Sequence, residues 1–226
     1  MQAIMETVFD IVYLITVIGM GFWILRHSNG EKIYRLFGGM AILLGFGDAF
    51  HLVPRAIALW TVGLQQYAAP LGFGKFVTSI TMTIFYVCFY HIWCLRYQKP
   101  QKPQKNSLTV LVYLLAVVRI VLCLMPQNQW LSYDAPLSWG IYRNIPFVIF
   151  GALMVWLYAK TAANHKEDSF RYIWLAIFLS FLFYIPVVLF ADTIPIIGML
   201  MIPKTCAYVW IVWTGYHTLK QNQLEQ

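Results

Sequence analysis

The stretch SLTVLVYLLAVVRIVLCLMP, residues 107–126, contains a single charged residue, Arg119. A helix needs about 20 consecutive, mostly apolar residues to cross the hydrocarbon core of a bilayer, so this stretch predicts a transmembrane helix. The rest of the chain has the same character. Charged residues make up 11% of its 226 residues, whereas a soluble domain has roughly 25%. Its mean hydropathy is +0.65. We therefore expect an integral membrane protein.

Further apolar stretches of similar length lie on both sides of this one. Together they predict an all-α fold, a seven-transmembrane helix bundle that forms a single domain over residues 1–226. Gly38, Gly39, Gly45 and Gly47 fall in the second stretch, where small residues allow helices to approach closely. The predicted spans are 5–26, 34–58, 71–96, 107–126, 138–160, 170–191 and 195–218.

Lys and Arg residues are distributed unevenly among the connectors between the spans. RHSNGEKIYR (26–35), RYQKPQKPQK (96–105) and KTAANHKEDSFR (160–171) are basic, whereas the alternate connectors contain no Lys or Arg. Cytoplasmic loops carry an excess of Lys and Arg, so the pattern predicts an outside N-terminus and a cytoplasmic C-terminus. We expect a multi-pass protein of the plasma membrane. The net charge of +7 is explained by these loops, and we expect no nucleic acid partner.

One helical face combines three ionisable side chains. In FGDAFHLVPR, residues 46–55, Asp48, His51 and Arg55 are spaced three and then four residues apart. This spacing places them on the same side of a helix. At 1.5 Å per residue from the inner end of the span, Asp48 lies ~21 Å and Arg55 ~30 Å up. The face therefore falls in the outer third of the membrane.

Polar residues of other spans fall at a similar depth. A charge at the bilayer centre costs about 2.5–3.5 kcal/mol on insertion scales, so such residues usually face the bundle interior. We expect a shared, outward-opening cavity with a net positive charge, which favours an anionic phosphate or carboxylate head group. The alternative is a set of separate ion pairs and snorkelling side chains. The expected ligand contacts are Arg55, Lys75, Arg119, Arg143, Asn144, Tyr184, Lys204 and Tyr208, with Tyr86 as a further hydroxyl and Asp48 and Asp192 as the acids.

Prolines occur in the outer parts of four spans. Proline removes a backbone hydrogen bond and kinks a helix. We therefore expect kinks at Pro54, Pro146, Pro186 and Pro203, two of which precede Arg55 and Lys204 directly.

Two classes of function fit this set. The first, which we favour from the sequence, is a membrane enzyme that modifies a lipid or amphiphile. Asp48 would orient His51, and His51 would be the general acid or base. The second is a receptor, sensor or carrier for a small anionic amphiphile. The sequence contains no HExxH motif and no convincing metal ligand set, and it indicates no particular cofactor.

Two family resemblances add to these hypotheses. YIPVV (184–188) is similar to the aromatic–proline stretch in helix 6 of microbial rhodopsins, and seven spans with a lysine in the last also resemble that family. This resemblance implies that Lys204 carries a retinal Schiff base, although Leu200 stands where a carboxylate is expected. LGFGDAF (44–50) resembles the Gly-Asp element of the lysoplasmalogenase-like family over a few residues, without that family's Ser-Asp element.

Overall fold

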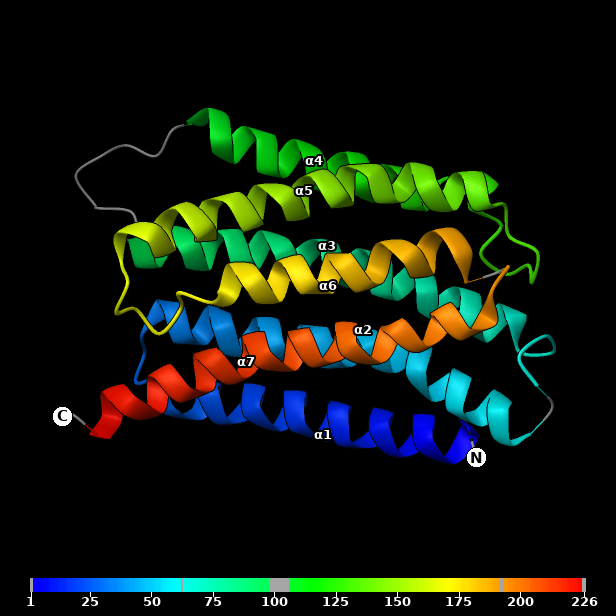
Figure 1. Cartoon of the computed structure of the whole chain (residues 1–226), viewed down its shortest axis with the longest axis horizontal. Coiled ribbons are helices and arrows are strands. Elements are labelled where there is room, and N and C mark those ends of the chain that lie inside the picture. Colours follow the sequence, from blue (N-terminus) through cyan, green and yellow to red (C-terminus); the bar gives the residue numbers. More distant parts are fainter. Residues whose placement is uncertain (1, 62, 98–105, 192, 225–226) are drawn as a thin grey trace.

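The computed structural model describes residues 2–61, 63–97, 106–191 and 193–224. Within these ranges the chain is all-helical and contains seven helices long and apolar enough to cross a membrane (Figure 1). Two short 3₁₀ segments, η1 (Pro126–Asn128) and η2 (Pro195–Leu200), precede α5 and α7. The helices are α1 (Gln2–His27), α2 (Lys32–Trp60), α3 (Ala68–Tyr97), α4 (Asn106–Leu124), α5 (Leu137–Asn164), α6 (Ile173–Phe190) and α7 (Met201–Leu224).

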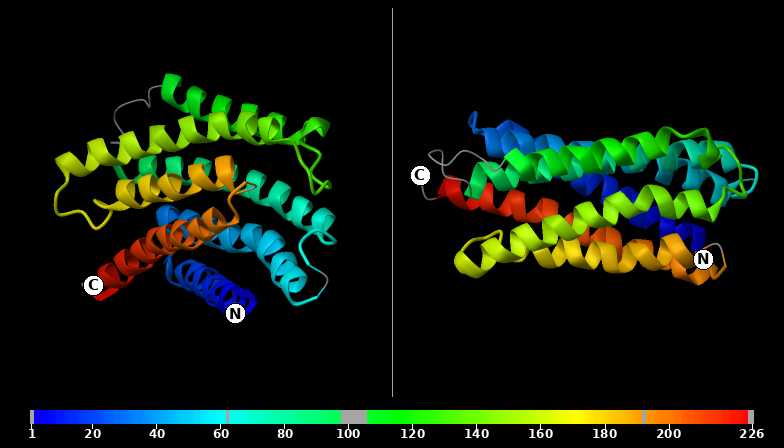
Figure 2. Two further views of the ribbon diagram at one scale, coloured as in Figure 1. Left: turned by 45° about the vertical axis from the view of Figure 1, so that its right-hand side comes forward. Right: turned by 90° about the horizontal axis from the view of Figure 1, so that it is seen from above.

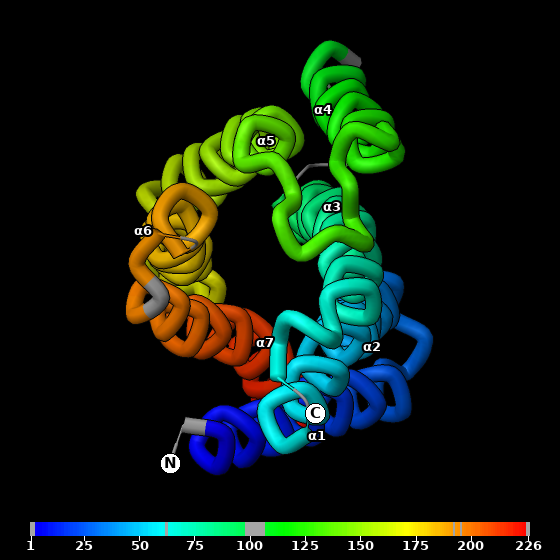
Figure 3. Tube along the Cα trace, turned by 90° about the vertical axis from the view of Figure 1, so that its right-hand side faces the viewer, coloured from blue at the N-terminus to red at the C-terminus, as the bar shows by residue number. Residues whose placement is uncertain are grey.

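The helices form a ring in sequence order. Each helix packs against the next, and α7 packs against α1, which closes the ring. Contacts between α3 and α5 leave α4 at the periphery, as the view along the bundle shows (Figure 3). The N- and C-termini lie at opposite ends of the bundle (Figures 1 and 2), as an odd number of spans requires.

The predicted seven-helix membrane fold is confirmed, and the helix ends differ from the predicted ones by up to six residues, the most at α7. The fourth helix ends at Leu124 rather than Pro126, because proline disfavours a helical conformation at the residue before it. Pro203 lies in the first turn of α7, where backbone N–H groups have no helical partner in any case. It therefore marks the start of a helix and not the expected kink, whereas Pro54 and Pro146 lie inside α2 and α5.

Close contact between α2 and α3 depends on Pro54 and a facing glycine. Proline at 54 leaves the carbonyl of Phe50 without its helical donor. Gly74 of α3 packs directly against this carbonyl, and a Cβ at Gly74 would collide with it and with the backbone of His51. One turn of α2 earlier, Thr78 Oγ1 donates a hydrogen bond to the carbonyl of Gly47 at 3.0 Å. These contacts fix the part of α2 that carries the polar face.

A carboxylate clamps the end of the bundle that carries the C-terminus. Asp168, in the connector between α5 and α6, accepts hydrogen bonds from Arg96 at 2.6 and 3.2 Å and from Tyr97 at 2.5 Å. The backbone N–H of Phe170 donates a further bond at 3.0 Å. Burial raises the pKa of the Asp168 carboxyl, but these hydrogen bonds outweigh burial and leave the pKa below its ordinary value. The clamp ties this connector to the end of α3.

Candidate ligand-binding site

Arg119 is a buried cation, and two of its three guanidinium nitrogens have no hydrogen-bond partner among the described residues. It lies on α4 with 2% of its surface exposed, and its guanidinium carbon sits 3.2 Å from the centroid of the Phe147 ring on α5. Its Nε and Nη1 groups have no hydrogen-bond partner within the described ranges. Tyr184, Cys123 and Tyr208 interact with it favourably, and none of these three is a carboxylate. An uncompensated buried charge is costly, so this guanidinium is suited to receive an anion.

Lys204 is a second buried cation, close to the start of α7. It is 8% exposed, and its Nζ lies 4.9 Å from the ring centroid of Tyr184 and 5.5 Å from that of Tyr208. Asp48 on α2 attracts it, and Arg119 repels it. Across the part of the chain that the structure describes, Lys204 forms no direct ion pair. Its charge is thus balanced only at a distance, by Asp48.

Phenol and amide groups surround these two cations. Tyr184 on α6 donates a hydrogen bond to Asn144 Oδ1 on α5 at 2.8 Å, and Asn144 Nδ2 donates to the carbonyl of Gly140 at 2.8 Å. Tyr86 on α3 is fully buried, and its hydroxyl has no hydrogen-bond partner among the described residues, although Tyr208 lies near it. The structure therefore brings together Arg119, Asn144, Tyr184, Lys204 and Tyr208 from four helices, with Tyr86 from a fifth.

Asp48 belongs to the edge of this cluster, and α1 determines its position. Tyr13 on α1 donates a hydrogen bond to Asp48 Oδ2 at 2.6 Å. Asp48 is half-buried and interacts electrostatically with Lys204. The carboxylate is therefore held by a phenol on one side and attracted to an ammonium group on the other.

His51 and Arg55 have other partners than those expected from the sequence. His51 Nδ1 lies 3.4 Å from the carbonyl of Leu71, and Asp48 bonds to Tyr13 instead of to His51. Within the described residues Asp48 and His51 therefore do not bond to each other, and the catalytic role expected of them stays a prediction. Arg55 Nε donates to Glu6 Oε2 on α1 at 2.9 Å. Glu6 is an acid that lies outside the polar set expected from the sequence.

The contacts of α2 with α1 repeat at a spacing of seven residues. Tyr13 and Glu6 differ by seven positions, as do their partners Asp48 and Arg55. Seven residues are almost two turns, so both pairs lie on one antiparallel helix seam. Two members of the polar face therefore hold α1 against α2. The matching spacing of Glu6 and Tyr13 is the signal in the sequence that could have indicated this.

Arg143 and Lys75 lie at the margins of the polar cluster. Arg143 Nη1 donates to Asn128 Oδ1 at 2.9 Å, and its guanidinium lies 4.2 Å from the Trp130 ring centroid, so it anchors the connector between α4 and α5. Lys75 is exposed on α3 and interacts electrostatically with His51. The expected acid Asp192 lies outside the described residues.

The fold and this cluster define the class of protein: an integral membrane protein, a seven-helix bundle with a buried, net-cationic polar cluster. Comparison of the chain with protein-family models, with curated proteins and with solved structures finds no match. The two family resemblances therefore rest on the residues quoted for them. The function has to be argued from the geometry of the cluster.

Proposed function

We propose that this protein binds the anionic head group of an amphiphile inside its helix bundle, as a receptor, sensor or carrier. The observation that carries the proposal is the Arg119 guanidinium, which is buried while its Nε and Nη1 groups lack partners in the described part of the chain. A carboxylate or phosphate oxygen would accept these hydrogen bonds and balance the charge. Charge-assisted hydrogen bonds of this kind are about twice as strong as neutral ones.

The surroundings of Arg119 fit an anionic head group with an apolar tail. Lys204 adds a second positive charge against the single carboxylate of Asp48. The buried Tyr86 hydroxyl, which lies near Tyr208, supplies one more donor. The rings of Phe147 and Phe181 contact each other and Tyr86, which provides an apolar wall beside the cations. That the site opens toward the outer face of the membrane remains a prediction from the sequence.

The enzyme hypothesis has less support than the binding hypothesis. It needs Asp48 to orient His51, whereas Asp48 bonds to Tyr13 and His51 lies against the Leu71 carbonyl. Binding requires neither group to act as a base. If a bound amphiphile were converted to product by the purified protein, the enzyme hypothesis would regain first place.

The test is ligand-dependent thermal stabilisation of the purified full-length protein. Oleate and lysophosphatidic acid carry an anionic head group, and monoolein is the neutral control. A ligand at 100 times its Kd stabilises a protein by about 2.7 kcal/mol. That corresponds to a rise in melting temperature of roughly 5–10 °C for a chain of this size. We expect this rise with at least one of the two anions and not with monoolein.

Variants show whether the effect arises in the cluster. Arg119→Gln should abolish the stabilisation, whereas Arg26→Gln should keep it, because Arg26 is exposed at the far end of α1. Equal stabilisation of the Arg119→Gln variant, or equal effects of monoolein and the anions, would contradict the proposal. Native mass spectrometry of the purified protein should identify the amphiphile that copurifies.

A retinal-binding site is the second candidate, and one observation favours it. Lys204 Nζ is buried beside two aromatic rings with Asp48 as a distant counter-charge, which is an environment that a protonated Schiff base would use. Adding all-trans-retinal to the purified protein should then produce a visible absorbance band that Lys204→Arg abolishes. No band in the wild type would eliminate this candidate.

A further inference from the structure

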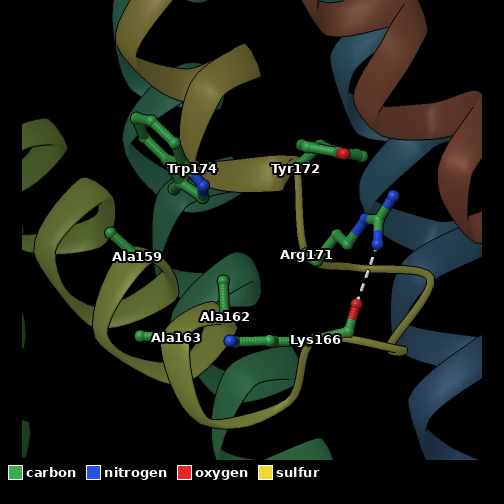
Figure 4. Close-up of a pocket in the computed structure, with 7 residues that line it drawn as sticks. All are labelled: Ala159, Ala162, Ala163, Lys166, Arg171, Tyr172 and Trp174. Atoms are coloured by element: carbon green, nitrogen blue, oxygen red, sulfur yellow. Dashed lines mark hydrogen bonds between the residues drawn. The ribbon is translucent and has the colours of Figure 1, made fainter.

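A second feature lies far from the buried cluster, where the connector between α5 and α6 returns to the bundle. An open groove of about 420 Å³ is formed there by the last turns of α5 and the first residues of α6 (Figure 4). Three small side chains of α5, Ala159, Ala162 and Ala163, line it together with two basic residues of the connector, Lys166 and Arg171. Tyr172 and Trp174 complete the lining. The groove therefore combines free space, positive charge and aromatic rings.

The two cations of this groove are available to a ligand. Lys166 and Arg171 are exposed, and within the described ranges neither forms an ion pair with a carboxylate. Arg171 Nη1 donates a hydrogen bond to the Lys166 carbonyl at 2.9 Å, shown as the dashed line in Figure 4. The guanidinium carbon also lies 4.4 Å from the Tyr172 ring centroid. These contacts hold the guanidinium beside the groove and leave its other N–H groups to bind an anion.

Hydrogen bonds to α3 and α7 hold the connector backbone that carries these cations. Asp168, between them in the sequence, is bound by Arg96 and Tyr97 of α3. Thr218 of α7 donates a hydrogen bond to Ser169 Oγ at 2.8 Å. A ligand therefore meets a connector that is already ordered, which lowers the entropic cost of binding.

An apolar stripe leads from the groove along α6. Phe178 and Leu182 follow Trp174 at intervals of four residues, so the three side chains lie on one side of the helix. Phe178 is 46% exposed and Leu182 is 50% exposed. In a bilayer these exposed faces contact acyl chains. The basic groove therefore lies at one end of an apolar track that points into the membrane.

We propose that this groove binds an anionic phospholipid of the leaflet at the C-terminal end of the bundle, predicted to be cytoplasmic. The phosphate contacts Lys166 and Arg171, the glycerol region occupies the space over the alanines, and an acyl chain follows Trp174, Phe178 and Leu182. Tyr and Trp rings are typical of this depth, at the boundary between head groups and hydrocarbon. The occupant is a lipid and not a soluble phosphate, because Trp174, which lines the groove, is also the first side chain of the apolar stripe.

The test is a lipid titration of the full-length protein in detergent, followed by native mass spectrometry. Dioleoyl-phosphatidylglycerol is the anionic probe, and dioleoyl-phosphatidylcholine is the neutral one. Near an anionic lipid each basic residue contributes about a fivefold factor, so K166Q/R171Q should weaken phosphatidylglycerol binding by about 30-fold. The matched control is K32Q/R35Q, which removes the same charge from exposed positions at the same end of the bundle. It should change binding by less than about threefold.

A third variant separates shape from charge. A162L/A163L fills the groove and keeps both cations, and it should also weaken phosphatidylglycerol binding. Equal losses in the K32Q/R35Q control would overturn the proposal in favour of general attraction to a basic surface. Competition by glycerol phosphate as effective as by the lipid itself would show a soluble anion site and would equally overturn it. Undiminished binding by K166Q/R171Q would show that the lipid sits elsewhere.

Discussion

Replacement of Arg119 by methionine should stabilise the ligand-free protein. Two nitrogens of its guanidinium are buried without a hydrogen-bond partner among the described residues, and each such donor costs about 1–3 kcal/mol, so removing both recovers about 2–6 kcal/mol. The contact of the guanidinium with the Phe147 ring opposes this by about 2 kcal/mol, and a methionine sulfur replaces part of that contact. The expected net gain in the free energy of unfolding is therefore about 0–4 kcal/mol, centred near 2 kcal/mol.

The assay is equilibrium unfolding in bicelles by SDS titration, monitored by circular dichroism. The protein used is a preparation that native mass spectrometry shows to be free of bound ligand. Arg143→Met is the matched control. Arg143 donates to Asn128 and lies over Trp130, so the same chemical change should cost about 1–3 kcal/mol there. The two variants are thus expected to shift stability in opposite directions. A loss of more than about 1 kcal/mol in ligand-free Arg119→Met would refute the reasoning, because the guanidinium would then be satisfied within the bundle.

Three further predictions concern the bundle itself. In a double-mutant cycle, Glu6→Gln and Arg55→Gln should show a coupling of about 1 kcal/mol, as expected of a half-buried pair; no coupling in the unfolding free energies would contradict the α1–α2 seam. Gly74→Ala should lower the free energy of unfolding by about 1–3 kcal/mol, because the added Cβ meets backbone atoms of α2. Gly39→Ala should leave it unchanged in the same assay, because no described atom of another segment lies within 4 Å of the added Cβ. Asp168→Asn should cost about 2 kcal/mol near pH 7. Because the folded pKa of Asp168 is lowered, its contribution is complete above about pH 4 and is lost as the pH falls through the folded value. Melting curves of the wild type and this variant should therefore converge in acid, and a constant difference at all pH values would be inconsistent with an ionised clamp.

The fold could be predicted from the sequence because lipid imposes a simple rule. Every backbone polar group in the hydrocarbon region must be satisfied within the chain, so long apolar stretches such as 107–126 have to be helices. The predicted helix ends are less accurate where a single residue, and not hydropathy, determines where the helix begins or ends. Pro126 and Pro203 both lie at such ends, and hydropathy does not distinguish a proline that begins a helix from one that kinks it.

The polar cluster was predictable only in part. The depth of a side chain in the membrane follows from counting residues along its helix, whereas the neighbouring helix toward which it points does not. Arg119 and Lys204 were placed at a similar depth from the sequence, and both are buried in the bundle. That Arg55 turns to Glu6 depends on how α1 and α2 are rotated against each other, which one helix alone does not determine. Asp168 was overlooked for a different reason. Its connector is basic overall, and the acid matters only because Arg96 lies 72 positions away in sequence and adjacent in space.

Comparison with two other arginines shows why the charge on Arg119 is unusual in this protein. Arg55 and Arg96 each find a carboxylate from another segment, at a distance typical of charge-assisted hydrogen bonds. Two half-buried guanidinium groups are thus satisfied by acids from other segments of the bundle. Arg119 is the most deeply buried of the three, where an unpaired charge costs most, and the described part of the chain supplies it with aromatic rings, phenols and a thiol instead of an acid. Under the proposed function, an anion from outside the chain balances the Arg119 charge, and the ligand-free stability of Arg119→Met is the measurement that tests this step.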